Sequence, residues 1–226
     1  MNTTNILSGP SFLPHQNPKK LIFMLHGYGD SAENFIHIAS PLEKKEWKAN
    51  YIALNAPSSI PNYSVGRQWF DLYPNGTYIA DAGSKEIEII SNEVLNSVKL
   101  IENTIRQTKD AYNLSFKDCF LMGFSQGGMM TFECGRNFCN RLGGLAILSG
   151  RIMYEDLEIN QSLVKTPLFI SHGDQDEVLP IKAFYAACSY LKEQKLDYEQ
   201  HVLKGDTHTI SPDAIKLLQK FIKKNL

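Results

Sequence analysis

The chain has 226 residues, of which 43% are hydrophobic, and a formal net charge of -1 at neutral pH. This length and composition suffice for one large core, so we expect a single α/β domain over residues 1–226. Positive and negative side chains are interspersed without an extended basic segment, which argues against nucleic acid as a partner. The N-terminus lacks the basic and apolar segments of a signal peptide, and no apolar run could cross a bilayer. We therefore expect a cytoplasmic protein without stable membrane insertion.

The first third of the chain alternates between strand-like and helix-like patterns. Residues 21–25 form an unbroken apolar run, typical of a strand buried on both faces of a sheet. A helix is expected over residues 31–46 and a second strand over residues 51–55. Residues 58–83 are rich in proline, glycine, asparagine and aromatic side chains without a period, which predicts a long loop of functional importance.

The rest of the chain continues the alternation. The clearest helix is expected over residues 84–109, where one apolar stripe comprises Ile87, Ile90, Val94, Val98, Ile101 and Ile105. Further strands are expected at residues 119–122, 142–148, 168–171 and 197–203, and further helices at residues 125–138, from Pro180 and from Pro212. Helical crossovers between apolar strands predict a mainly parallel sheet covered by helices on both faces. Ligands of such sheets bind beyond the carboxyl ends of the strands.

The four cysteines show no CxxC spacing, and they fall in the expected strand at residues 119–122 and in helical segments. We expect them to be buried, reduced thiols rather than disulfide partners or metal ligands. They are Cys119, Cys134, Cys139 and Cys188.

Residues 123–127 read Gly-Phe-Ser-Gln-Gly and lie between an expected strand and an expected helix. Gly-x-Ser-x-Gly in this context is typical of a nucleophile elbow, in which flanking glycines permit the sharp turn that exposes the serine Oγ. The pentapeptide by itself is a weak signal, because Ser125 could also serve only as the N-cap of the helix.

A catalytic serine needs a base, and the base needs an acid that orients it, in the chain order Ser, Asp, His for this topology. Asp174 and Asp176 follow one expected strand, and His208 follows the last expected strand. Spacing alone does not choose between the two aspartates, either of which could instead cap a helix or a turn. His172 with both aspartates also resembles a metal-ligand cluster, but a metal site would leave Ser125 unexplained.

Acyl transfer also requires N–H donors for an oxyanion. One is expected from the residue after the nucleophile, Gln126, and another from the loop after an early strand. The loop at residues 26–30, His-Gly-Tyr-Gly-Asp, occupies that place, and Tyr28 N–H is the natural candidate. Asp30 is better explained as a helix N-cap.

These loops together resemble the acyl-protein thioesterase and small carboxylesterase family of α/β hydrolases, also called the phospholipase/carboxylesterase family. The combination of Trp-Phe-Asp, Gly-Phe-Ser-Gln-Gly-Gly and His-Gly-Asp-x-Asp is specific, and the matching elements span nearly the whole chain. They lie at residues 25–30, 68–71, 123–128, 148–150 and 172–176 and at His208.

The resemblance implies an α/β-hydrolase fold without a separate lid domain, and a serine esterase or thioesterase that needs no cofactor or metal. It implies Ser125 as nucleophile, Asp176 as the acid and His208 as the base, and it supports Tyr28 and Gln126 as oxyanion donors. Tyr28 replaces a leucine that is common in the family.

We expect an open apolar groove that binds the acyl group of the ester or thioester substrate. The same groove could serve a homodimer contact. Its expected substrate-binding residues are Trp69, Phe70 and Leu72.

Two other functions are considered. The chain could be a non-catalytic hydrolase-fold protein that binds a small ligand, which labelling by a fluorophosphonate would distinguish from an enzyme. It could also be a dienelactone-type or peptide-type serine hydrolase, which a substrate panel would distinguish.

Overall fold

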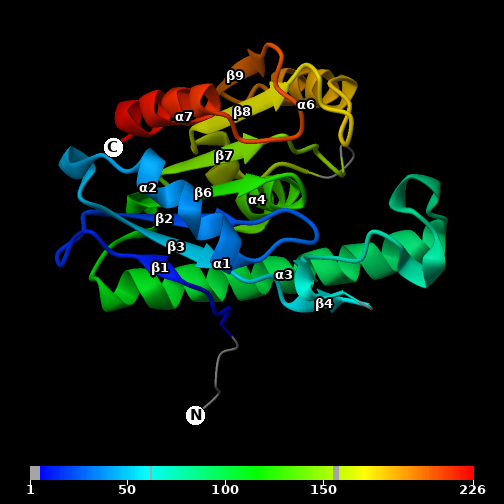
Figure 1. The fold of residues 1–226 in the computed structure, drawn as a ribbon, viewed down its shortest axis with the longest axis horizontal. Coiled ribbons are helices and arrows are strands. Elements are labelled where there is room, and N and C mark those ends of the chain that lie inside the picture. The colour runs from blue at the N-terminus through cyan, green and yellow to red at the C-terminus, as the bar shows by residue number, and fades with distance from the viewer. Residues whose placement is uncertain (1–5, 62, 155–157) are drawn as a thin grey trace.

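The computed structural model describes residues 6–61, 63–154 and 158–226, and its centre is a seven-stranded sheet (Figure 1). The strand order is β1-β3-β2-β6-β7-β8-β9; β1 is antiparallel to β3, and the other strands are parallel. The mainly parallel α/β sheet predicted from the sequence is therefore confirmed. The strands are β1 (Ser11–Phe12), β2 (Lys20–Leu25), β3 (Ala49–Leu54), β6 (Cys119–Phe124), β7 (Gly144–Leu148), β8 (Leu168–Gly173) and β9 (Tyr198–Leu203).

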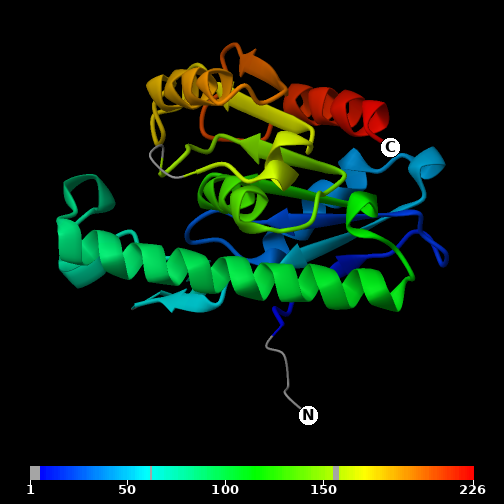
Figure 2. The ribbon, with the colours of Figure 1, turned by 180° about the vertical axis from the view of Figure 1, so that it is seen from behind.

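Helices cover both faces of the sheet, as Figures 1 and 2 show from opposite sides. One face carries α1 (Ala32–Phe35), α2 (Ala39–Leu42) and α7 (Pro212–Lys224). The other face carries α3 (Ser84–Ala111), α4 (Gln126–Asn137), α5 (Gln161–Val164) and α6 (Lys182–Glu193). Two hydrophobic clusters result, one on each face, because strands with apolar residues on both sides must be covered twice.

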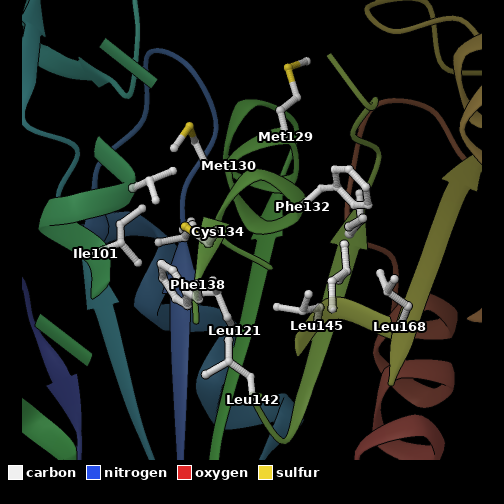
Figure 3. Close-up of a cluster of buried hydrophobic side chains, with 14 of the residues drawn as sticks. Ile101, Leu121, Met129, Met130, Phe132, Cys134, Phe138, Leu142, Leu145 and Leu168 are labelled. Atoms are coloured by element: carbon white, nitrogen blue, oxygen red, sulfur yellow. The ribbon is translucent and has the colours of Figure 1, made fainter. Parts of the chain in front are cut away.

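The cluster beneath α4 fixes the helix that begins directly after Ser125. Figure 3 shows Met130 and Cys134 of α4 beside Ile101 of α3, and Phe132 toward Leu145 of β7. All five side chains are buried. Because such a core is close-packed, α4 is held firmly against the sheet.

The helix expected over residues 31–46 is shorter and interrupted. The chain is helical from Ala32 to Leu42, with a 3-10 turn (Ile36–Ile38) between α1 and α2, and it becomes extended at Glu43. Pro41 lacks the N–H that would bond one turn back, which weakens a regular α-helix at this point. A second 3-10 turn (Lys45–Trp47) then leads into β3.

The segment 58–83 is not the featureless loop that its composition predicted. It contains an antiparallel hairpin of β4 (Ser58–Ile60) and β5 (Tyr63–Gln68), separate from the main sheet, and two 3-10 turns, Pro74–Gly76 and Ile79–Asp81. Hydrogen bonds to neighbouring loops hold this hairpin in place. Its strands do not need a buried apolar face, and they lack the regular apolar alternation by which sequence patterning detects a strand.

Two expected burials are wrong. Ile87 belongs to the predicted stripe but is 48% exposed, because the N-terminal end of α3 extends beyond the sheet (Figure 2). Cys139 lies after the end of α4 and is exposed, whereas Cys119, Cys134 and Cys188 are buried; all four are free thiols. Within the described ranges, no helix is long and apolar enough to cross a bilayer.

Candidate active site

The candidate site lies at the carboxyl ends of β2 and β6, where the strand order reverses. The chain leaves β2 for β3 on one side and later returns to β6 on the other. Such a switch point leaves a crevice between loops that run in opposite directions. Leu25 pairs with Gly123, so the loops that begin at His26 and Phe124 start side by side.

Ser125 occupies the turn between β6 and α4 in a strained conformation. Its φ of 54° and ψ of -117° are rare for a non-glycine residue, and its side chain makes no capping hydrogen bond to α4. A Cβ at Gly123 would lie 2.1 Å from Gly127 O, and a Cβ at Gly127 would lie 2.1 Å from Leu25 O. Both flanking glycines are therefore required by close backbone approach. The geometry is that of a nucleophile elbow, and it does not match the alternative of a simple N-cap.

Asp176 and His208 meet across the loops that follow β8 and β9. The His208 Nδ1–H donates to Asp176 Oδ2 at 2.6 Å, since a carboxylate can only accept. The other oxygen of Asp176, Oδ1, accepts from the N–H groups of Val178 and Leu179 at 3.0 and 2.7 Å. Asp174 instead accepts from Gly205 N–H at 2.7 Å. Of the two aspartates that spacing left open, Asp176 is therefore the one that contacts His208, and its role as the acid stays a prediction.

The His208 side chain lies close to the turn that carries Ser125. The His208 ring packs against the ring of Phe124, the residue before Ser125, with centroids 4.7 Å apart. Within the part of the chain that the structure describes, Ser125 Oγ makes no hydrogen bond. Catalytic hydrogen bonds are often long without substrate and tighten in its presence.

His172 is buried beside Asp176, and the sequence analysis did not predict this contact. Its Nε2–H donates to Leu179 O at 2.6 Å and lies 3.3 Å from Asp176 Oδ2. Burial lowers the pKa of His172, so the ring is neutral near pH 7. Its position directly before Gly173 was considered only as part of a metal cluster. Among the described residues, no three His, Cys, Asp or Glu side chains are grouped to hold a metal ion.

The loop that carries Tyr28 lies against the elbow. A Cβ at Gly27 would be 3.4 Å from the Ser125 Cβ, so this loop directly adjoins the nucleophile. Within the described ranges, Tyr28 N–H has no acceptor in the protein, and Gln126 N–H opens α4, where the first amides lack helical partners. The two amides proposed as oxyanion donors are therefore free to donate.

The β4–β5 hairpin fastens this loop to the body of the protein. Gly29 N–H donates to Arg67 O, and Arg67 N–H donates to Asp30 O, both at 3.0 Å. The Arg67 guanidinium group donates to Ala56 O and Pro57 O. Residues 58–83, which show no hydrophobic period in the sequence, thus include the hairpin that holds the loop at residues 26–30 in place.

His26 anchors the start of the same loop. Ala56 N–H donates to His26 Nε2 at 3.1 Å, so Nδ1 carries the proton and donates to Gly27 O at 2.7 Å. Burial lowers the pKa of His26, which keeps the ring neutral. The only sequence signal for this role is its place between strand β2 and Gly27.

The Gln126 side chain joins the elbow to the segment that follows β5. Its Oε1 accepts from Trp69 N–H at 3.0 Å, and its Nε2 donates to Phe70 O at 2.8 Å. The indole of Trp69 donates to His26 O at 2.9 Å. Trp69 and Phe70 are each only 1% exposed and belong to the core, whereas Leu72 is partly exposed. Of the three residues expected to bind substrate, only Leu72 is more than marginally accessible, and substrate contact by all three stays a prediction.

A cavity of about 300 Å³, with four apolar side chains in its lining, lies between the start of α3 with the turn before it and the segment that follows β7. Ser125 N–H donates to Leu148 O at the end of β7, and the chain then turns at Ser149, where φ is 45°, toward the cavity. The residues that line it are Ile79, Ile87, Ile90, Arg151, Met153 and Tyr154.

Comparisons with known proteins agree with this geometry. Residues 12–226 match the family model described as Phospholipase/Carboxylesterase. Acyl-protein thioesterase 1 of Saccharomyces cerevisiae is 29% identical over 93% of this chain and 95% of its own length. Carboxylesterase SOBER1 of Arabidopsis thaliana is 31% identical over 92% of this chain and 91% of its own.

Two solved structures of esterases have the same fold over most of this chain. A crystal structure of SOBER1 superposes with a TM-score of 0.76 at 27% identity, covering 91% of this chain and 98% of that one. The crystal structure of esterase PE8 superposes with a TM-score of 0.81 at 25% identity, covering 98% of this chain and all of that one.

Proposed function

Because the chain belongs to the phospholipase/carboxylesterase family of serine hydrolases, we propose that it cleaves carboxylic esters and thioesters through an acyl-enzyme on Ser125. The observation that carries these roles is the Asp176–His208 hydrogen bond beside a strained serine elbow. The hydrolase class itself is supported by relatives named as thioesterases and carboxylesterases. The residue roles rest on the geometry.

In the first half of the reaction, His208 Nε2 takes the proton of Ser125 Oγ while Oγ attacks the carbonyl carbon. The negative charge that develops on the carbonyl oxygen is stabilised by the N–H groups of Tyr28 and Gln126. His208 then gives the proton to the leaving alcohol or thiol, and the acyl group stays on Ser125. Asp176 holds the imidazole in the tautomer with Nδ1 protonated and stabilises the imidazolium that forms.

Water completes the cycle in the second half. His208 removes a proton from water, the hydroxide attacks the acyl-enzyme, and the proton returns to Ser125 Oγ as the carboxylic acid leaves. Chemistry of this kind needs no group beyond the side chains and amides named above.

The substrates that fit best carry an acyl chain, such as a lysophospholipid, an S-acylated protein or a small acyl ester. The supporting feature is the apolar cavity beyond β7, whose three isoleucines and Met153 suit methylene groups. Each buried methylene contributes about 0.8 kcal/mol. We place the acyl chain in this cavity, with Leu72 as a further contact.

A fluorophosphonate probe tests the nucleophile. Only an activated hydroxyl beside an oxyanion site attacks the probe's phosphorus quickly, so mass spectrometry should place the adduct on Ser125. Ser125→Ala should not label. Ser149→Ala is the matched control, because Ser149 is another serine with positive φ at a strand end and should leave labelling intact. Equal labelling of Ser125→Ala and the parent protein would exclude this nucleophile, and no labelling of the parent would favour a binding protein.

A further inference from the structure

One cation belongs to an otherwise uncharged cavity. Arg151 lines the apolar cavity beyond β7 together with Ile79, Ile87, Ile90, Met153 and Tyr154. Its Nε is buried and has no hydrogen-bond partner among the described residues. A guanidinium group is always charged, and a buried N–H without an acceptor costs free energy. The Arg151 side chain as a whole is only partly buried, so a guanidinium charge with no ion-pair partner among the described residues lies at the wall of this cavity.

The neighbouring ion pair does not supply the missing acceptor. Glu133 and Arg136, both in α4 and both buried, form an ion pair with each other. Arg136 also donates to Tyr154 O at 2.9 Å, and its guanidinium carbon lies 5.5 Å from the centre of the Tyr154 ring. Two arginines thus lie near Tyr154, and among the described residues one carboxylate, that of Glu133, is paired with either of them. The charge of Arg151 remains uncompensated by Glu133.

The cation lies within reach of the nucleophile. Ser125 N–H bonds to Leu148 O at 2.9 Å, and Arg151 follows Leu148 by three residues. Three residues span at most about 11 Å even when fully extended. A group held by Ser125 and extending into the cavity would therefore pass or approach Arg151.

Arginine binds carboxylate and phosphate through paired N–H donors, and such charge-assisted bonds are roughly twice as strong as neutral ones. A neutral acyl chain would remove water from Arg151 and give nothing in return. A chain with an anionic group would satisfy the guanidinium group while its methylenes fill the apolar walls.

We propose that Arg151 makes this hydrolase selective for esters and thioesters whose apolar chain carries a nearby carboxylate or phosphate. This inference rests on the proposed function and names the substrate class of the same site. The anion can belong to the acyl group itself or to the alcohol that leaves, and the two sources are separated by experiment.

The test compares matched pairs of substrates that differ only in the anion. The acyl-side pair is p-nitrophenyl octanoate and the p-nitrophenyl hemiester of the eight-carbon dicarboxylic acid. The alcohol-side pair is a monoacylglycerol and its phosphomonoester, a lysophosphatidic acid. For at least one pair, kcat/KM should be greater for the anionic member, and the preferred pair identifies where the anion lies.

Variants connect that preference to Arg151. Arg151→Gln should reduce the ratio of anionic to neutral kcat/KM by about tenfold, and Arg151→Lys should reduce it less. Arg141→Gln is the control, because Arg141 is an exposed arginine that lines a different surface site and should leave the ratio unchanged. Raising the salt concentration should also lower the ratio in the parent protein.

The outcomes separate the two proposals. Fluorophosphonate labelling of Arg151→Gln shows that the variant is folded, and its substrate ratio is then interpretable. A parent that cleaves neutral and anionic members equally, or an unchanged ratio in Arg151→Gln, would overturn the role of Arg151 while leaving Ser125 hydrolysis intact. A parent that cleaves none of the four substrates and does not label would instead reject the proposed function.

Discussion

Two buried carboxylates in this protein each pair with a nitrogen-bearing side chain but have different surroundings. Asp176 follows β8, and both of its oxygens accept hydrogen bonds, from His208 and from the N–H groups of Val178 and Leu179. Glu133 lies within α4 and pairs with Arg136, but its Oε1 has no partner among the described residues. Burial raises the pKa of Glu133 to about 7, although Arg136 acts in the opposite direction.

The difference shows what a strand end provides that a helix interior does not. In the turn after β8, two backbone N–H groups are free to face a carboxylate, whereas inside α4 the backbone N–H groups are used by the helix. A single cation therefore only partly replaces the water that Glu133 loses. We infer that the loop after β8 suits a carboxylate whose two oxygens both accept hydrogen bonds, and that the helix position suits an acid that gains a proton near neutral pH.

The largest expected effect is on catalysis, from a change of Asp176 in the loop after β8. Asp176→Asn should lower kcat by about 10⁴, because the amide favours the wrong tautomer of His208 and leaves its cation unsupported. Asp174→Asn is the matched control, since Asp174 bonds only to loop groups outside the Asp176–His208 pair, and it should cost far less. Steady-state kinetics on one ester decides; equal losses in the two variants would remove the distinction between the aspartates.

The second test concerns stability and pH at Glu133. An acid whose pKa is raised on folding contributes stability below its unfolded value of 4.5, and this contribution is lost as pH rises through about 7. The free energy of unfolding of the parent minus that of Glu133→Gln should therefore decrease by on the order of 3 kcal/mol between pH 4.5 and 8. Denaturant titrations at several pH values measure it.

Glu102→Gln serves as the control for that series, because it also removes a helical glutamate from an ion pair with an arginine, and the Glu102–Arg106 pair is partly exposed and contributes little to stability. If the difference between the parent and Glu133→Gln is the same at every pH, Glu133 does not take up a proton on folding, and the contrast with Asp176 disappears.

The smallest expected effect separates buried from accessible apolar residues. In the parent, kcat/KM should rise about three- to fourfold per methylene of substrate until the cavity is full. Leu72→Ala should flatten this rise for long chains. Phe70→Ala should instead lower the melting temperature and reduce activity on every chain length by one factor, because Phe70 is a core residue. A flattened rise in Phe70→Ala would show that the loop opens to admit the chain.

Sequence patterning predicted the main sheet because its strands are apolar on both faces, as in residues 21–25. It also predicted Ser125 and His208 as site residues, because each follows a strand in the order that the chemistry requires, and the structure brings both to the same edge of the sheet. It could not choose Asp176 over Asp174 without the family resemblance, since both lie in one loop and only the three-dimensional path of that loop decides which reaches His208.

The remaining errors have a common cause in long-range contacts. The β4–β5 hairpin is stabilised by bonds of Arg67 to two other loops, which local sequence does not reveal. Ile87 continues a regular apolar stripe, yet the sheet ends before that turn of α3. The hydrogen bonds of His26 and of the Gln126 side chain likewise go to residues that are distant in sequence. The bond of His172 to Leu179 depends on the turn between them, which the sequence does not reveal.

The hairpin that fastens the Tyr28 loop has a consequence for how the protein fails under stress. A two-stranded hairpin is marginal by itself, and Tyr63 and Val65 on β5 are 50% and 70% exposed. Segments with few buried contacts open at a lower free-energy cost than the core, on faster hydrogen-exchange timescales. Opening of β4–β5 would break the bonds of Arg67 to Gly29 and Asp30 and so release the loop that carries Tyr28, while both core clusters stay intact. Heat or mild denaturant should thus inactivate the enzyme before it unfolds globally. The loss of activity would then measure the opening of the β4–β5 hairpin rather than global unfolding.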